Sequence, residues 1–237
     1  MLKRFLLAAV AVAVCSSTSY AQFEGLVTVF DNVEGAVVNN QAASDTGAFI
    51  ASTNIDDVTF AATTAVQAVE FSGIFAASPI PGGDAFLAEA DQNFTINIFG
   101  DDGAGVADTA AGAVASFNVG NQVNRVDAPN PNLVANPNLL SEAFDFTAAI
   151  DFTFTGGETF HLQIVNASPG TDTDQFNQAV AANAGNAFST LDPVNLTGLT
   201  QQTFATDFQL LAAVPEPSSA VLLALGFAGF AARRRRR

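Results

Sequence analysis

Few residues of this chain could take part in catalysis or metal binding, and their types exclude several kinds of site. His161 is the only histidine and Cys15 the only cysteine among 237 residues. A serine triad needs a histidine base, and no Gly-x-Ser-x-Gly segment stands before His161. A zinc site as a rule needs more than one imidazole or thiolate ligand. We therefore expect a protein that is not an enzyme, with His161 solvated or cross-strand-paired on the polar face of a strand.

Carboxylates are the most abundant candidate ligands. Asp101 and Asp102 precede Gly103, and Asp172 and Asp174 stand two residues apart. Each pair can supply two hard oxygen ligands from one turn, which suits calcium, although neither pair matches the EF-hand loop. These four residues are the candidate metal ligands, and the alternative is that they are solvated turn acids. No two acids stand out as the carboxylate pair of a glycosidase.

The most specific pattern lies at the C-terminus. An apolar, uncharged segment at 218–232 follows a proline-punctuated motif and precedes a basic end. The motif is Val214, Pro215, Glu216 and Pro217, and the end is Arg233, Arg234, Arg235, Arg236 and Arg237. Proline fixes φ and lacks an N–H, so no helix continues through the motif. Arginine clusters favour the cytoplasmic side of a membrane, which puts residues 22–213 outside the cytoplasm.

The apolar segment is short for a transmembrane helix. The fifteen residues of 218–232 would span about 22 Å as a helix, against a hydrocarbon core of roughly 30 Å. Snorkelling arginines or local thinning of the bilayer would make up the difference. The alternatives to a sorting segment are a permanent tail anchor and a C-terminal core helix.

The N-terminus predicts export as well. Lys3 and Arg4 precede ten apolar residues at 5–14, which are too few to span a membrane. Small residues before position 22 fit the signal peptidase, so residues 1–21 are a predicted signal peptide that is cleaved after Ala21. Lipidation at Cys15 is the alternative.

The C-terminal pattern resembles the PEP-CTERM signal of Gram-negative bacteria that make extracellular polysaccharide. The resemblance implies that residues 214–237 are recognised by an exosortase, a membrane cysteine protease, which cuts near Pro215–Pro217. It also implies transient anchoring in the membrane through the C-terminus, a final location in the cell envelope, outer surface or extracellular matrix, and association with exopolysaccharide.

The predicted secreted domain, residues 22–213, is strongly acidic. Of 23 acids only Glu216 lies in the two end segments, and of eight bases only Arg125 lies between them. The domain thus has 22 acids and one base, a formal charge of −21. Such a surface repels polyanions, which excludes nucleic acid as a partner. Without cysteine it forms no disulfide, and it is long enough to build a core without one.

Period-two hydrophobicity predicts strands throughout this domain. Phe144 to Thr155 is the clearest case, because its even positions are apolar and its odd positions are mostly Asp and Thr. A hairpin through Gly156-Gly157-Glu158 is expected to join it to a strand at 159–166. Other strands are expected at 26–31, 57–60, 66–75, 94–99, 113–123 and 204–210, loops at 79–83 and 128–138, and a long loop with a short helical turn at 171–187.

Such a density of strands predicts an all-β fold, an antiparallel β-sandwich of jelly-roll-like type. The segments 94–103, 159–166 and 205–210 look like the β-sandwich ectodomain common among PEP-CTERM proteins. This resemblance implies a non-catalytic surface or matrix component. The alternative is a carbohydrate-binding module, calcium-dependent or not, whose site lies on a face of the sandwich.

Overall fold

The structure is a computed structural model, and it describes residues 23–34, 40–46, 51–77, 92–121, 124–127, 141–167, 174–182, 185 and 187–213. These residues form strands without an α-helix. The strands are β1 (Leu26–Asp31), β2 (Asn40–Ala43), β3 (Thr53–Thr59), β4 (Thr64–Ala77), β5 (Phe94–Gly100), β6 (Ala115–Gly120), β7 (Asn124–Asp127), β8 (Ser141–Phe154), β9 (Thr159–Asn166), β10 (Asp174–Ala182), β11 (Phe188–Thr190), β12 (Thr200–Gln201), β13 (Phe204–Thr206) and β14 (Phe208–Ala213).

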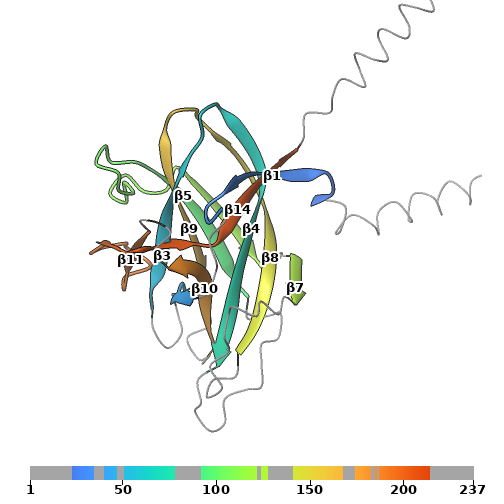
Figure 1. Cartoon of the computed structure of the whole chain (residues 1–237). Coiled ribbons are helices and arrows are strands. Elements are labelled where there is room, and N and C mark those ends of the chain that lie inside the picture. The colour runs from blue at the N-terminus through green and yellow to red at the C-terminus, as the bar shows by residue number, and fades with distance from the viewer. Residues whose placement is uncertain are drawn as a thin grey trace, which may run out of the picture. The chain divides into compact units, whose positions relative to one another are not determined.

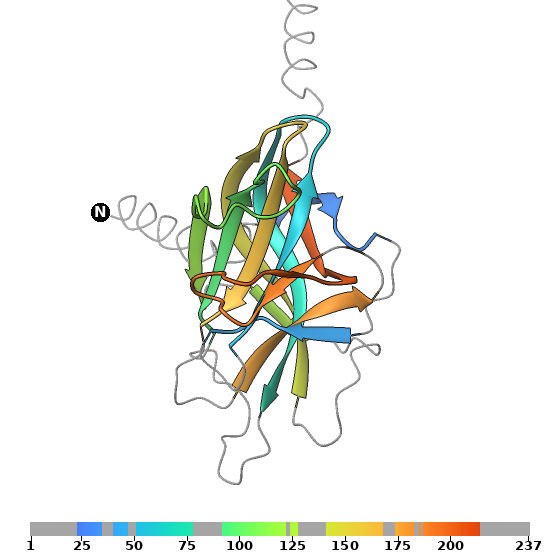
Figure 2. The ribbon, with the colours of Figure 1, turned by 90° about the vertical axis from the view of Figure 1, so that its left-hand side faces the viewer.

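Two antiparallel sheets pack face to face, which confirms the predicted sandwich (Figure 1). Sheet A is built around β4, which pairs with β8 along one edge and with β14 and β10 along the other. In the described part of the chain it has eight strands. Sheet B has six and runs β12-β11-β3-β9-β5-β6. Figure 2 shows β6, β5, β9 and β3 of sheet B side by side.

Several connections cross from one sheet to the other, as in a jelly roll, and two of them lie side by side. The β3–β4 and β8–β9 connections do so together, because β3 pairs with β9 in sheet B and β4 pairs with β8 in sheet A. Glycine is required where the two connections touch, since a Cβ on Gly156 would lie 2.6 Å from the Thr63 nitrogen. Gly157 adopts a φ of +79° and donates its N–H to the Phe60 carbonyl at 2.8 Å.

This crossing corrects the predicted hairpin at Gly156-Gly157-Glu158. The turn is there, but β8 and β9 belong to different sheets and do not pair. Alternation reports which side chains face the core, and both strands face the same core. It does not report the partner of a strand, so a hairpin and an inter-sheet corner share one sequence pattern.

The core lies between the sheets and consists mainly of phenylalanine and branched aliphatic side chains. The fully buried phenylalanines are Phe71, Phe94, Phe146, Phe154, Phe176 and Phe208. Phe94 of sheet B meets Phe176 of sheet A edge-on, with ring centroids 4.9 Å apart. The even positions of β8 face this core as predicted, except that Phe152 is only partly buried at its margin.

Two other expectations about strands are wrong. The segment expected as a loop with a helical turn contains β10, which pairs with β4, β2 and β13. Its composition is rich in Asn, Gln and Ala, so its strand conformation comes from these partners and not from local propensity. The expected final strand is broken at Asp207 into β13, which pairs with β10, and β14, which pairs with β4.

Residues 28–212 form one compact unit. The loops expected at 79–83 and 128–138 and the signal peptide at 1–21 lie outside the described residues. The sorting segment at 214–237 lies outside them as well.

Candidate functional site

His161 lies on the outer face of sheet B and is fully buried. In register it stands between Asp57 of β3 and Phe99 of β5, and its exposed fraction is 0%. Two segments fold over this face, since Ala107 and Leu196 pack with Ile55 and Phe99 in a small apolar cluster. The sequence therefore predicted the correct face, whereas the solvated alternative is wrong because loops cover that face.

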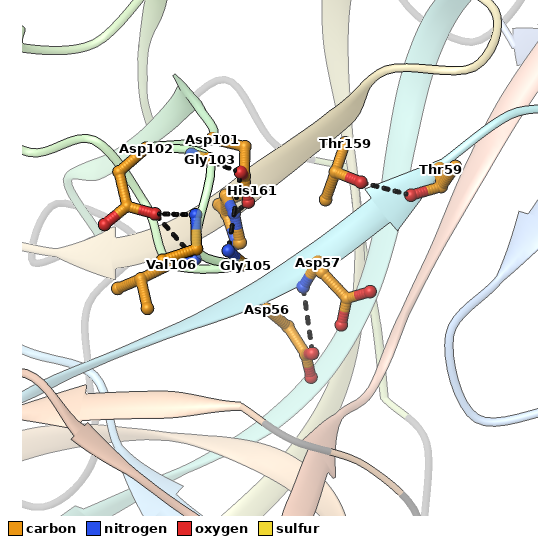
Figure 3. Close-up of polar contacts among 11 residues, drawn as sticks. Asp56, Asp57, Thr59, Asp101, Asp102, Gly103, Gly105, Val106, Thr159 and His161 are labelled. Carbon is orange, nitrogen blue, oxygen red and sulfur yellow. Dashed lines mark hydrogen bonds and ion pairs between the residues drawn. The ribbon is translucent and has the colours of Figure 1, made fainter.

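The partner of His161 is Asp101, the residue that directly follows β5. The His161 Nε2 donates to the Asp101 Oδ2 at 3.0 Å, while the Asp101 Oδ1 accepts the N–H groups of Gly103 at 2.7 Å and Gly105 at 3.4 Å (Figure 3). The hydrogen bond from His161 is the main reason that the pKa of Asp101 lies below its usual value, and the two glycine N–H groups act in the same direction. The carboxylate thus fixes both the imidazole and the turn.

Asp102 also shapes this turn. Its Oδ1 accepts the N–H groups of Ala104 at 2.7 Å and Val106 at 3.3 Å. Within the described residues, no group of three or more His, Cys, Asp and Glu side chains is arranged to hold a metal ion. The other predicted pair is not assembled here, because Asp174 begins β10 and Asp172 lies outside the described residues. Asp101 and Asp102 act as turn-forming groups.

A second group of carboxylates, which the sequence analysis missed, lines a cavity on the outer face of sheet A. The cavity has a volume of about 220 Å³ and is lined by Glu70, Phe71, Ser72, Asp145, Asp207 and Gln209. The Ser72 hydroxyl donates to the Asp145 Oδ1 at 2.8 Å. These side chains come from β4, β8, β14 and the β13–β14 junction. The sequence showed that polar residues alternate with apolar ones along these strands. It did not show which strands pair, and this pairing is what brings the cavity residues together.

The surroundings of this cavity disfavour the charged forms of Glu70 and Asp207. Burial is the main cause that raises the pKa of Glu70, and repulsion from Asp145 and Asp207 raises it further. Burial also raises the pKa of Asp207, against the Ser72 hydroxyl, and repulsion from Asp31 and Asp145 adds to it. With Ser72 and Gln209, the cavity presents hydrogen-bonding groups suited to hydroxyls, amines or cations.

A third site is the carboxylate of Asp56, which is buried inside the sandwich and joins the two sheets. Its Oδ2 accepts the Thr206 N–H at 2.7 Å, the Asn32 Nδ2 at 2.8 Å and the Thr206 hydroxyl at 3.2 Å. Its Oδ1 accepts the Asp57 N–H at 3.0 Å. Burial raises the pKa of Asp56 to about 6, and the hydrogen bonds oppose this. Its exposed fraction of 1% makes it a structural group.

Comparison with known proteins gives one specific result. Residues 213–236 match the PEP-CTERM protein-sorting motif. No curated protein matches the chain. Among solved structures, the crystal structure of a CocE/NonD family hydrolase from Staphylococcus aureus is similar with a TM-score of 0.28 and 10% identity, over 80% of this chain and 36% of that one.

The membrane segment predicted at 218–232 and the cleavage position at Ala21 lie outside the described residues. Within the residues that are described, no helix is long and apolar enough to cross a membrane. The match at 213–236 confirms the resemblance stated for the C-terminal pattern. The chain therefore carries a PEP-CTERM sorting motif, which marks it as an exported protein that an exosortase sorts to the cell envelope.

Proposed function

We propose that residues 22–213 are a non-catalytic component of the cell surface or extracellular matrix that associates with exopolysaccharide. The sorting motif at 213–236 carries the proposal, because it marks the protein as exported and sorted to the cell envelope. The state of the only histidine supports the non-catalytic part. His161 is fully buried and hydrogen-bonded to Asp101, so its ring offers no base to a substrate in solvent.

The cavity on sheet A favours a second candidate, a carbohydrate-binding module. Glu70, Asp145, Asp207 and Gln209 offer carboxylate and amide groups, which are suited to sugar hydroxyls. The negative charge of the domain favours a neutral polysaccharide, or an anionic one that is bridged by divalent cations. In the bridged case, calcium would act as a counter-ion shared by the protein and the anionic polysaccharide.

Co-sedimentation of the exported protein with the exopolysaccharide of its own producer tests both candidates. The first predicts that the protein sediments with the polysaccharide and releases no new reducing ends from it, and release of such ends would overturn the non-catalytic assignment. The second predicts that a double variant, Glu70→Gln with Asp207→Asn, lowers the sedimented fraction at least tenfold. Asp151→Asn is the matched control, since Asp151 is exposed on β8 outside the cavity lining.

The sorting motif has its own test, which is independent of the ligand. Intact-mass measurement of the exported protein should show a species that ends near Pro215–Pro217. Replacing Arg233 to Arg237 with serine should weaken retention at the membrane and stop ordered processing, because the basic stop is lost. A mature protein that still ends at Arg237 would contradict cleavage.

A further inference from the structure

Exported proteins can be modified on asparagine in Asn-x-Ser/Thr sequons, which need a free side-chain amide and a free hydroxyl. The chain has three such sequons between residues 22 and 213. They are Asn93-Phe94-Thr95, Asn166-Ala167-Ser168 and Asn195-Leu196-Thr197. The three asparagines differ in exposure and in the hydrogen bonds of their side chains. These differences indicate which of them is accessible for modification.

Asn166 is closed to modification by the fold. Its exposed fraction is 0%, and its Nδ2 donates to the Asp45 Oδ2 at 3.0 Å. Its Oδ1 accepts the Asn93 N–H at 2.8 Å. Both ends of this amide are used inside the sandwich, so its nitrogen cannot reach an enzyme while the domain is folded.

Asn195 is exposed, but its sequon is held by Asp192. The Asp192 Oδ1 accepts the Asn195 Nδ2 at 3.2 Å, and the Asp192 Oδ2 accepts the Thr197 hydroxyl at 2.7 Å. The middle residue, Leu196, is buried at a φ of +55°. The amide and the hydroxyl must both leave Asp192, and the turn must open, before an enzyme can read this sequon.

Asn93 is exposed and stands directly before β5. Its backbone is anchored on both sides, since its N–H donates to the Asn166 Oδ1 and its carbonyl accepts the Ala167 N–H at 2.9 Å. The next side chain, Phe94, is buried in the core. Among the hydrogen bonds of the described residues, none engages the Asn93 side-chain amide or the Thr95 hydroxyl.

Accessibility therefore selects Asn93 among the three asparagines.

We propose that Asn93 carries an N-linked oligosaccharide, attached after export. The donor is an oligosaccharide linked to a polyprenyl pyrophosphate. A bond forms between the Asn93 Nδ2 and C1 of the first sugar while the bond from C1 to the pyrophosphate oxygen breaks. The lipid pyrophosphate leaves and the amide nitrogen gives up one proton. This modification rests on export alone and goes beyond the proposed association with exopolysaccharide.

The test uses the full chain with its own signal peptide, produced in a bacterium whose oligosaccharyltransferase modifies a reference acceptor protein in the same cells. Intact mass and peptide mapping should find one oligosaccharide, on Asn93. Asn93→Gln should abolish the added mass, and Asn195→Gln should leave it unchanged. An unmodified Asn93 beside a modified reference protein, or an oligosaccharide on Asn166 or Asn195 instead, would overturn the proposal.

Thr95 supplies a matched pair of variants. Thr95→Val keeps the shape of the side chain and removes the hydroxyl, so the modification should be lost. Thr95→Ser keeps the hydroxyl, so the modification should remain. Equal modification of the two variants would contradict recognition of this sequon. Thermal melts of both proteins show whether each is folded, which separates lost recognition from lost structure.

Discussion

At the scale of single residues, two buried polar side chains, those of His161 and Asp56, are used for structure. His161 closes a turn through Asp101, and Asp56 joins the sheets through Thr206 and Asn32. The sequence identified His161 and Asp101 as residues of interest but did not pair them. The reason is that the covering of sheet B depends on two segments, around Ala107 and around Leu196, that are far apart in the chain.

Asp101→Ala should lower the free energy of unfolding by about 1–3 kcal/mol, because it leaves the buried His161 Nε2 without its acceptor. Asp102→Ala is the matched control and should cost less, since Asp102 bonds only the N–H groups of an exposed turn. The pKa of Asp101 is lowered by folding. Its contribution is therefore complete above the ordinary value of 3.8 and is lost as the pH falls through the lower folded value. Urea melts at pH 7 measure the first effect, and equal losses for the two variants would contradict it.

Asp56 predicts a pH dependence of the opposite sign. Because burial raises its pKa from 3.8 to about 6, the folded protein binds a proton more tightly than the unfolded chain does. The free energy of unfolding should therefore fall as the pH rises from 3.8 to about 6 and should change no further above that on account of Asp56. Glu70 and Asp207 add to the same trend, since their pKa values are raised too.

Urea melts across this pH range check the prediction. Asp56→Asn should flatten the slope and should also cost about 1–3 kcal/mol, because an amide replaces one of two acceptor oxygens that face N–H and O–H donors. Thr153→Ala on the exposed side of β8, which removes no titratable group, should leave the slope as it is. An unchanged slope in the Asp56→Asn protein would mean that Asp56 does not titrate in this range.

At the scale of elements, alternation located most of the longer strands but not their partners, and it missed β2, β7, β10, β11 and β12. The register of β8 was readable because six inward positions repeat with period two over a long segment. Its partners, β4 and β7, were not readable, since pairing is a long-range property. The same limit explains the missed strand β10 and the missed cavity, whose carboxylates come from strands that are distant in the chain.

The register of β8 can be tested by truncation. Phe146→Ala should cost about 3–5 kcal/mol, the usual penalty for a large cavity in a core, because Phe146 is fully buried. Phe152→Ala should cost less than Phe146→Ala, since Phe152 is partly buried at the margin of the core. Thr153→Ala, on the exposed side, should cost well under 1 kcal/mol. Similar losses for Phe146 and Thr153 in urea melts would show that the register is wrong.

At the scale of the whole molecule, the fold class and the features that are local in the sequence could be predicted, whereas the side chains that the fold brings together could not. The sorting motif is a contiguous segment, so reading it needed no fold. The charge of residues 22–213 is likewise a property of composition. Where that charge gathers depends on the fold, and one place in the described residues where it does so is the cavity with Glu70, Asp145 and Asp207.

This charge predicts how the domain responds to salt. A formal charge of −21 on residues 22–213 destabilises the compact state by self-repulsion, and screening shortens its reach from about 30 Å at 0.01 M to about 8 Å at 0.15 M salt. The melting temperature should therefore rise with NaCl. A specific calcium site would add stability beyond that of magnesium at matched ionic strength, by mass action on the folded state. Thermal melts in NaCl, MgCl₂ and CaCl₂ separate the cases: identical magnesium and calcium curves leave only a general acidic surface, and a calcium-specific rise that Glu70→Gln removes would place the ion in the cavity on sheet A.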